Sequence, residues 1–199
     1  MVAVNRSRVE LAVRLLLEAL GEDPERPELR ETPERVAEAF ADLLWGRERD
    51  PREALQVLEE PGAEGLVAVR DLPFYSLCEH HLLPFRGKVH LAYLPREGKI
   101  AGLGRLSLLV RMVSRRLQLQ ERMTREIADA LTDALQPEGT LVVVEAEHLC
   151  LEVKDGRAAG TGVVTAAARG LLSAEPERSR AAALLFPRRD LALFWQGSV

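Results

Sequence analysis

The hydrophobic pattern of this 199-residue chain changes its period three times, and the order of these changes restricts the fold more than any other feature. Apolar residues recur at helical spacing in some stretches and follow strand-like patterns in others. The helical stretches are 5–20, 32–45 and 106–135, and the strand-like ones are 66–69, 88–94, 140–153 and 162–168. Helices, strands, a long helix and strands again predict an α+β fold with antiparallel strand pairs, since a parallel sheet requires regular alternation of strands and helices.

Glycine, proline and threonine residues set the expected helix boundaries. Gly21 ends the first helix, and Thr32 is the expected N-cap of the second because Pro33 follows it. A further short helix is expected at about 52–59. The longest periodic stretch, 106–135, forms either one long helix or two nearly continuous ones.

Charged residues and prolines between 47 and 64 mark the expected boundary between two parts of the chain. We expect an N-terminal helical region at 1–60, a main domain at 61–175 and a tail at 176–199. The aromatic pair at 194–195 either packs at the end of the tail or forms an interface.

Composition and charge exclude several broad classes of protein. Charged residues make up 29% of the chain and no apolar run approaches the length of a membrane span, which argues against disorder and against bilayer insertion. The N-terminal segment mixes charges with its apolar residues, so we interpret it as an amphipathic helix rather than a cleaved signal and expect a cytoplasmic protein. A formal net charge of −4 argues against a nucleic-acid partner, although a local basic patch could hold a phosphorylated small molecule.

Both cysteines lie close in sequence to three of the four histidines. Cys78 and His81 have the spacing at which one turn supplies two metal ligands, and Cys150 on a distant strand would be a third. Three protein ligands leave one position of a tetrahedral zinc ion open, as a catalytic zinc requires. His148 would face the same side of the strand as Cys150, so His80 and His148 are left to move protons near neutral pH.

Other interpretations of these residues stay open. The cysteines could form a closed structural zinc site or be buried thiols without a metal, because free cysteine is among the most buried residue types. His90 is expected to be an ordinary packed histidine in a strand.

A polar segment at 114–124 contains Arg116, Gln120 and Glu121. It is either the solvated face of a helix or a recognition surface. A carboxylate beside an amide can bind the NH and NH₂ edge of a purine, and arginines are suited to phosphate.

Several segments together closely resemble the GTP cyclohydrolase I family. They are LCEHHLLPFRGKVHLAYLP at 77–95, SRRLQLQERMTREIADAL at 114–131, VVVEAEHLCLEV at 142–153, and the helical 20–40, which looks like the family's N-terminal helices. The resemblance implies the tunnelling fold (T-fold), in which an antiparallel sheet is backed by two helices and subunits join their sheets into a ring-shaped barrel. Two pentameric rings would form a homodecamer with active sites at the subunit interfaces.

The resemblance also implies the chemistry and the residues that perform it. GTP is hydrolysed at C8 of the guanine, which opens the imidazole ring, releases formate and gives 7,8-dihydroneopterin triphosphate for tetrahydrofolate synthesis. Zinc lowers the pKa of a water molecule and so supplies hydroxide near neutral pH. The implied residues are Cys78, His81 and Cys150 as zinc ligands, His80 and His148 in proton transfer, and Gln120 and Glu121 at the guanine's polar edge. We expect the cations Arg105, Arg116 and Lys154 to bind the substrate in place of triphosphate contacts that the family usually has.

The chain departs from the family's pattern where the triphosphate is held. Gly104 and Arg105 stand where the family usually has serine and lysine, Leu108 replaces an arginine, and Lys154 precedes an aspartate where an arginine is usual. Each lost charge-assisted hydrogen bond removes on the order of 1.5–3 kcal/mol of binding free energy. We therefore predict a divergent member of the family. The alternatives are a paralogue that binds or hydrolyses another purine nucleotide or a pterin, and a non-catalytic T-fold subunit.

Overall fold

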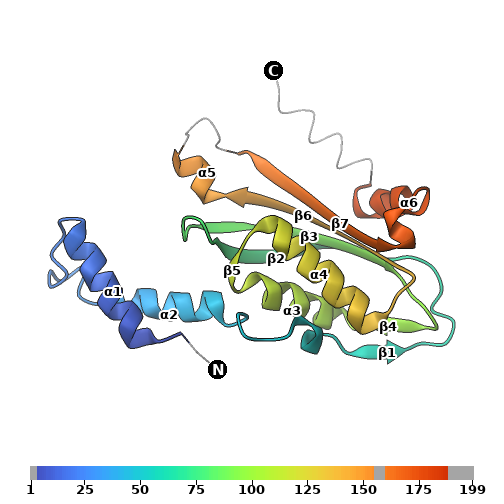
Figure 1. Ribbon diagram of the computed structural model, residues 1–199, viewed down its shortest axis with the longest axis horizontal. Coiled ribbons are helices and arrows are strands. Elements are labelled where there is room, and N and C mark those ends of the chain that lie inside the picture. Colours follow the sequence, from blue (N-terminus) through green and yellow to red (C-terminus); the bar gives the residue numbers. More distant parts are fainter. Residues whose placement is uncertain (1–3, 155–159, 188–199) are drawn as a thin grey trace, which may run out of the picture.

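The computed structural model describes residues 4–154 and 160–187, the side chain of Lys154 excepted, and forms an antiparallel sheet with helices on both faces (Figure 1). The sheet has the strand order β5-β2-β3-β6-β7, and every neighbouring pair is antiparallel except β5 and β2. Its strands are β2 (Val67–Cys78), β3 (Pro84–Leu94), β5 (Leu117–Gln118), β6 (Gly139–His148) and β7 (Gly162–Gly170). The predicted α+β class is confirmed.

Two helices, α3 (Leu103–Ser114) and α4 (Gln120–Leu135), cover one face of the sheet (Figure 1). Alternate residues of β3, including Val89, Leu91 and Tyr93, point to this face and are almost fully buried. They pack with helix residues such as Leu109 and Ile127 into one hydrophobic cluster, which is the main core. The core therefore lies between the sheet and the α3–α4 pair.

The opposite face is covered at one end by the short helix α6 (Glu177–Leu185), which follows a turn of 3-10 helix, η3 (Leu171–Ser173). Ala92 and Leu141 belong to this face, and they pack with Ala181 and Leu185 of α6 in a second, smaller cluster. The first part of the expected tail is thus a packed helix. The aromatic pair at 194–195 lies outside the described residues.

The N-terminal helices α1 (Arg6–Ala19) and α2 (Thr32–Leu44) form a hairpin that extends away from the sheet (Figure 1). Both helices occur where the sequence predicts them. Helix α1 buries none of its residues, and Leu11, Leu15, Leu16 and Leu20 are 57–69% exposed. This apolar surface is not covered by any other part of the chain that the structure describes.

Two expected helix boundaries are wrong. Thr32 lies inside α2 and Glu31 is the flanking residue, so the helix begins one residue early with Pro33 in its first turn and no side-chain cap. The short helix expected at 52–59 is a 3-10 turn, η1 (Pro51–Ala54), followed by strand β1 (Val57–Glu59). The strand forms because its backbone pairs with β4 (Lys99–Ala101), a partner that local sequence does not reveal.

The long periodic stretch at 106–135 is two helices rather than one. Arg115 leaves the helical conformation at φ −83° and ψ 57°, and the chain then forms β5, which pairs with Leu77 and Cys78. The β-prone run at 140–153 ends as a strand at His148, and a short helix, α5 (Leu149–Lys154), follows it. Strand β2 also continues to Cys78, so the turn between β2 and β3 is shorter than the sequence suggests.

None of the helices in the described ranges is long and apolar enough to cross a membrane. The division of the chain at 60 and 175 stays a prediction.

Gly46 joins the helical hairpin to the main body through a close backbone approach. Its N–H donates to the carbonyl of Arg115 at 2.9 Å, and a Cβ atom there would lie 2.1 Å from the carbonyl oxygen of Met112. Gly46→Ala should therefore lower the free energy of unfolding by about 1–3 kcal/mol, because the backbone must shift to admit the methyl group. Urea unfolding followed by circular dichroism measures this change.

Gly104→Ala is the matched control, since a methyl group in this first turn of α3 meets no atom within 4 Å. There alanine should raise stability by up to about 1 kcal/mol through its helix propensity. Equal effects of the two substitutions would contradict the packing constraint at Gly46.

Candidate metal centre and active site

Three metal-ligand side chains from two distant segments meet at one end of the sheet. Potential ligand atoms of Cys78, His81 and Cys150 all lie within 4.8 Å of one another. Zinc–sulfur bonds of 2.3 Å in a tetrahedron place two sulfurs about 3.8 Å apart, so small side-chain movements suffice for all three to bind one ion. Two thiols and an imidazole are a donor set that suits zinc, and the residues present therefore fit this metal.

The strand order explains why these residues meet. Cys78 ends β2 and His81 lies in the turn to β3, which is closed by backbone hydrogen bonds between Cys78 and Leu83 and between Leu82 and Cys78, each 2.9 Å. Leu82 adopts a left-handed conformation at φ 54° to make this turn. Strand β6 lies beside β3 and runs back toward the turn, so the chain that follows its end carries Cys150 to Cys78.

Cys150 lies in the first turn of α5 and not on a strand, which corrects the expectation that it shares a strand face with His148. It still reaches the cluster because α5 begins directly after β6. Burial raises the pKa of the Cys150 thiol, and the neighbouring sulfur of Cys78 raises it further. A divalent cation between the two sulfurs would reverse this effect by binding the thiolates.

His148 is held in place by two contacts. Its ring stacks on Phe85, its cross-strand partner in β3, with the ring centroids 4.6 Å apart and the planes at 4°. Its Nε2 lies 2.7 Å from Oε1 of Gln120, the first residue of α4. The NH₂ group of Gln120 donates to the carbonyls of Val144 and Val163 at 3.0 and 2.9 Å, which fixes the amide with its oxygen toward His148.

This arrangement determines which nitrogen of His148 is available for proton transfer. Because the Gln120 oxygen can only accept, Nε2 of the histidine carries a proton, and Nδ1 is the atom that gains or loses one. Burial lowers the pKa of His148, and the negative charge of Glu121 opposes that shift. The buried amide of Gln120 thus has three partners within the chain, and through one of them it supports His148.

Glu121 and His80, which are both expected to be site residues, are exposed. Glu121 lies in the first turn of α4 next to Gln120, and its side chain is exposed near His148. His80 is also exposed, and its ring lies 6.3 Å from that of His81 between ring centroids. Both can reach a molecule that enters the site from solvent.

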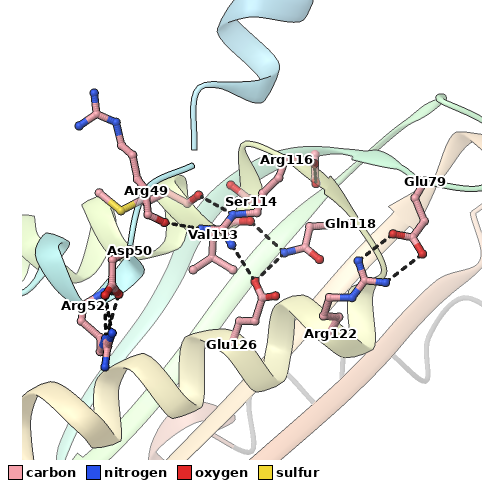
Figure 2. A network of polar contacts seen from close by, with 12 residues as sticks. Arg49, Asp50, Arg52, Glu79, Val113, Ser114, Arg116, Gln118, Arg122 and Glu126 are labelled. Atoms are coloured by element: carbon pink, nitrogen blue, oxygen red, sulfur yellow. Dashed lines mark hydrogen bonds and ion pairs between the residues drawn. The ribbon is translucent and has the colours of Figure 1, made fainter. Parts of the chain in front are cut away.

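Arg116 makes its side-chain contacts with α3, α4 and the segment that follows α2 (Figure 2). Its guanidinium donates to the carbonyls of Met112 and Arg49 and pairs with Glu126 at 3.4 Å, while its side chain is only 17% exposed. That Arg116 binds substrate stays a prediction, because in the single chain its guanidinium is engaged by these three partners. Its three contacts hold the end of α3 against α4 and against the segment that follows α2.

Arg105 is also distant from the metal ligands within one chain. It lies at the start of α3, where it donates to Gln56 at 3.4 Å, whereas the end of α3 leads into β5 beside Cys78. The helix between these points spans about 18 Å at 1.5 Å per residue. The side chain of Lys154 lies outside the described residues, and Leu108 packs partly buried against the core.

Two further features of the site were not anticipated from the sequence. Phe85 supports the ring of His148, and the only sequence signal for this is its aromatic character in the strand after the CEHH segment. Glu79 pairs with Arg122, which both belong to the recognised motifs. His90 is a packed histidine as expected, 5% exposed and with its ring beside Phe186.

Comparisons with known proteins relate the whole chain to one family. The sequence profile of GTP cyclohydrolase I matches residues 9–185. GTP cyclohydrolase 1 of Geobacillus kaustophilus is 49% identical over 172 residues, which are 86% of this chain and 92% of that protein. The enzyme of the same name from Carboxydothermus hydrogenoformans is 45% identical over 191 residues, 94% of this chain and 100% of that protein.

Among solved structures, a crystal structure of an archaeosine synthase QueF-like protein in the apo form aligns with a TM-score of 0.45 and 20% identity, covering 53% of this chain and 93% of that chain.

The prediction of a divergent member is not supported. Identities of 45–49% extend over most of the chain, so the departures at Gly104 and Leu108 are local. The antiparallel sheet with α3 and α4 on one face agrees with the expected T-fold. The matched residues also include α6, the part of the tail that the structure describes up to Leu185.

The purified chain should bind about one zinc ion, and Cys150→Ala should remove most of it, because two remaining ligands hold zinc weakly. His80→Ala is the matched control, since His80 precedes a ligand in the sequence and is not a member of the ligand cluster. Mass spectrometry of metal content after dialysis measures both. Metal retained by the first variant and lost by the second would contradict the ligand set.

Proposed function

The chain belongs to the GTP cyclohydrolase I family, and from this membership we propose that it hydrolyses GTP at C8 of the guanine. The reaction breaks the two bonds from C8 to ring nitrogens, releases C8 as formate and, after the ribose rearranges and the new ring closes, gives 7,8-dihydroneopterin triphosphate. The observation that carries the proposal is the Cys78–His81–Cys150 cluster beside the oriented ring of His148.

Cys78, His81 and Cys150 would hold zinc through two thiolates and one imidazole. When bound, the ion lowers the pKa of a water molecule and so makes hydroxide available near neutral pH. Burial of both cysteines leaves the exposed His81 side of the cluster as the approach for water and substrate.

The chain's own groups position the guanine and move protons. Glu121 accepts hydrogen bonds from N1–H and the 2-amino group of the base, since its exposed carboxylate lies close to His148. His148 transfers a proton at N7 through Nδ1, while Gln120 and Phe85 keep the imidazole in one orientation. His80 is a second proton carrier on the exposed side. Direct contact of Gln120 with the base stays a prediction.

The enzyme acts as a homo-oligomer, and a decamer of two five-membered rings is the assembly we propose. Three observations support a multisubunit site. Helix α1 exposes an apolar surface, Arg105 lies at the far end of α3 from the metal ligands, and within the described ranges β7 has a strand on one side only. Within one chain, Arg105 lies too far from the metal ligands to contact a triphosphate bound beside them. A neighbouring copy in the oligomer can supply its Arg105 side chain to that triphosphate.

A cytoplasmic location is part of the same proposal. Both cysteines are free thiols in the structure, as is usual for proteins in a reducing compartment.

Zinc-loaded protein should release formate from GTP and form a product that fluoresces after oxidation, with GDP and GMP slower because they offer fewer phosphate contacts. His148→Ala should lower kcat about 10²- to 10⁴-fold, as expected when a proton-transfer group is lost, while its zinc content stays unchanged. A coupled formate assay across the three nucleotides measures these rates. Absence of formate from all three with zinc bound would refute the proposal and favour a binding protein.

Mixed oligomers test whether neighbouring chains share the site. Arg105→Glu and Cys150→Ala should each be nearly inactive alone, but co-expression with two affinity tags should restore activity, since about a quarter of randomly assembled shared sites contain both native residues. Activity no greater than the sum of the two separate variants would place Arg105 and the metal in the same chain, or outside a shared site.

A further inference from the structure

The turn that carries His81 is attached to helix α4 by one ion pair (Figure 2). Glu79 follows Cys78 directly, and its two carboxylate oxygens accept hydrogen bonds from Arg122 at 2.7 and 2.9 Å. Both guanidinium NH₂ groups take part, so the contact is bidentate and fixes the direction of both side chains.

Arg122 lies on the first turn of α4, directly after Gln120 and Glu121. The pair therefore joins two parts of the site that come from separate segments. One part is the metal turn, residues 79–83, with His80 and His81. The other is the start of α4, which fixes His148 through Gln120 and places Glu121 near the same ring.

Few other contacts restrain the metal turn. Its backbone hydrogen bonds run from Cys78 to Leu83, from Leu82 to Cys78, and from Glu79 to Gln118 of β5 at 3.2 Å. Among the residues that the structure describes, no other side-chain hydrogen bond or ion pair links this turn to α4. The ion pair thus acts together with the backbone bond from Glu79 to Gln118 and with the packing of Leu83 on the core, and it is the side-chain contact that reaches α4 itself.

The partial exposure of the ion pair limits its contribution to the global stability of the protein. The side chains of Arg122 and Glu79 are 36% and 30% exposed, and ion pairs of this kind add little to global stability. Its effect is local, because a metal ligand in a short turn must be held within a fraction of an ångström to keep its affinity.

We propose that the Glu79–Arg122 ion pair is a positioning element, which sets the metal turn against the start of α4 and so couples zinc binding to the groups that hold the base. Neither residue is a metal ligand or touches the substrate in this proposal. The proposal rests on the metal site of the proposed function, and its test reads the metal directly.

Glu79→Gln removes one charge and keeps the side-chain length, whereas Arg122→Gln removes one charge and shortens the side chain. Positioning predicts that both lower zinc affinity, by about tenfold, which is the lower end for residues that support metal ligands. Simple electrostatics predicts opposite signs, since loss of Arg122 removes a positive charge near the cation and would strengthen binding. The sign for Arg122→Gln therefore separates the two explanations.

The measurement is competition with a chromogenic chelator, performed on the full-length protein at fixed pH. The double variant should bind zinc about as weakly as either single variant, because the same contact is lost in all three. Arg122→Lys keeps the positive charge but cannot form the bidentate contact with Glu79. Its zinc affinity should lie between those of the native protein and Arg122→Gln. Circular dichroism and the melting temperature confirm that each variant is folded.

Arg169→Gln is the matched control, because Arg169 of β7 pairs with Asp129 of α4 at 2.7 Å with a side chain 35% exposed, remote from the metal turn. It should leave zinc affinity unchanged. Unchanged affinity in the Glu79 and Arg122 variants, tighter binding by Arg122→Gln, or an equal loss in the control would each overturn the proposal. Native protein that binds no zinc would overturn the metal site itself, a different and recognisable result.

Discussion

The antiparallel register of β3 and β6 decides where the chemistry of this chain can occur. Phe85 lies opposite His148 near one end of this ladder. That end adjoins the metal turn, residues 79–83, and the first turn of α5, which carries Cys150. A shift by a single residue would turn His148 to the other face of the sheet. The apolar residues that fix the register, such as Val89 and its partner Val144, are fully buried. Core packing therefore fixes the spacing of the ligands, two of which, Cys78 and Cys150, belong to the core cluster itself.

Polar groups at the start of α4 extend this order to the rest of the site. Gln120 is 2% exposed and bonds to two strand carbonyls and to His148. A buried amide with these partners has one acceptable orientation. Reversing it would place its oxygen against two carbonyl oxygens and its NH₂ group against the N–H of His148. Thr124, one turn later, shares a hydrogen bond of 2.6 Å with Thr165 of β7. Side-chain hydrogen bonds thus join the start of α4 to both β6 and β7, the two strands that border the site.

The sequence predicts the elements and the metal ligands better than it predicts the roles of polar side chains. Ligand spacing at Cys78 and His81 and the hydrophobic periods are local signals, so the cluster and the α+β class could be anticipated. The contacts of Arg116 with Arg49 and Glu126 could not be anticipated, because they depend on where α3 ends and how the chain before η1 returns to it. Strand β1 similarly depends on a partner some forty residues away along the chain.

The sheet described here is unfinished at both edges. Strand β5 pairs with only Leu77 and Cys78 of the twelve-residue β2, and β7 lies at the opposite border. Open edges attract any extended chain, and natural proteins rarely leave long ones bare. In the ring that we propose, these edges would pair with neighbouring copies, so their protection would depend on protein concentration as well as on folding.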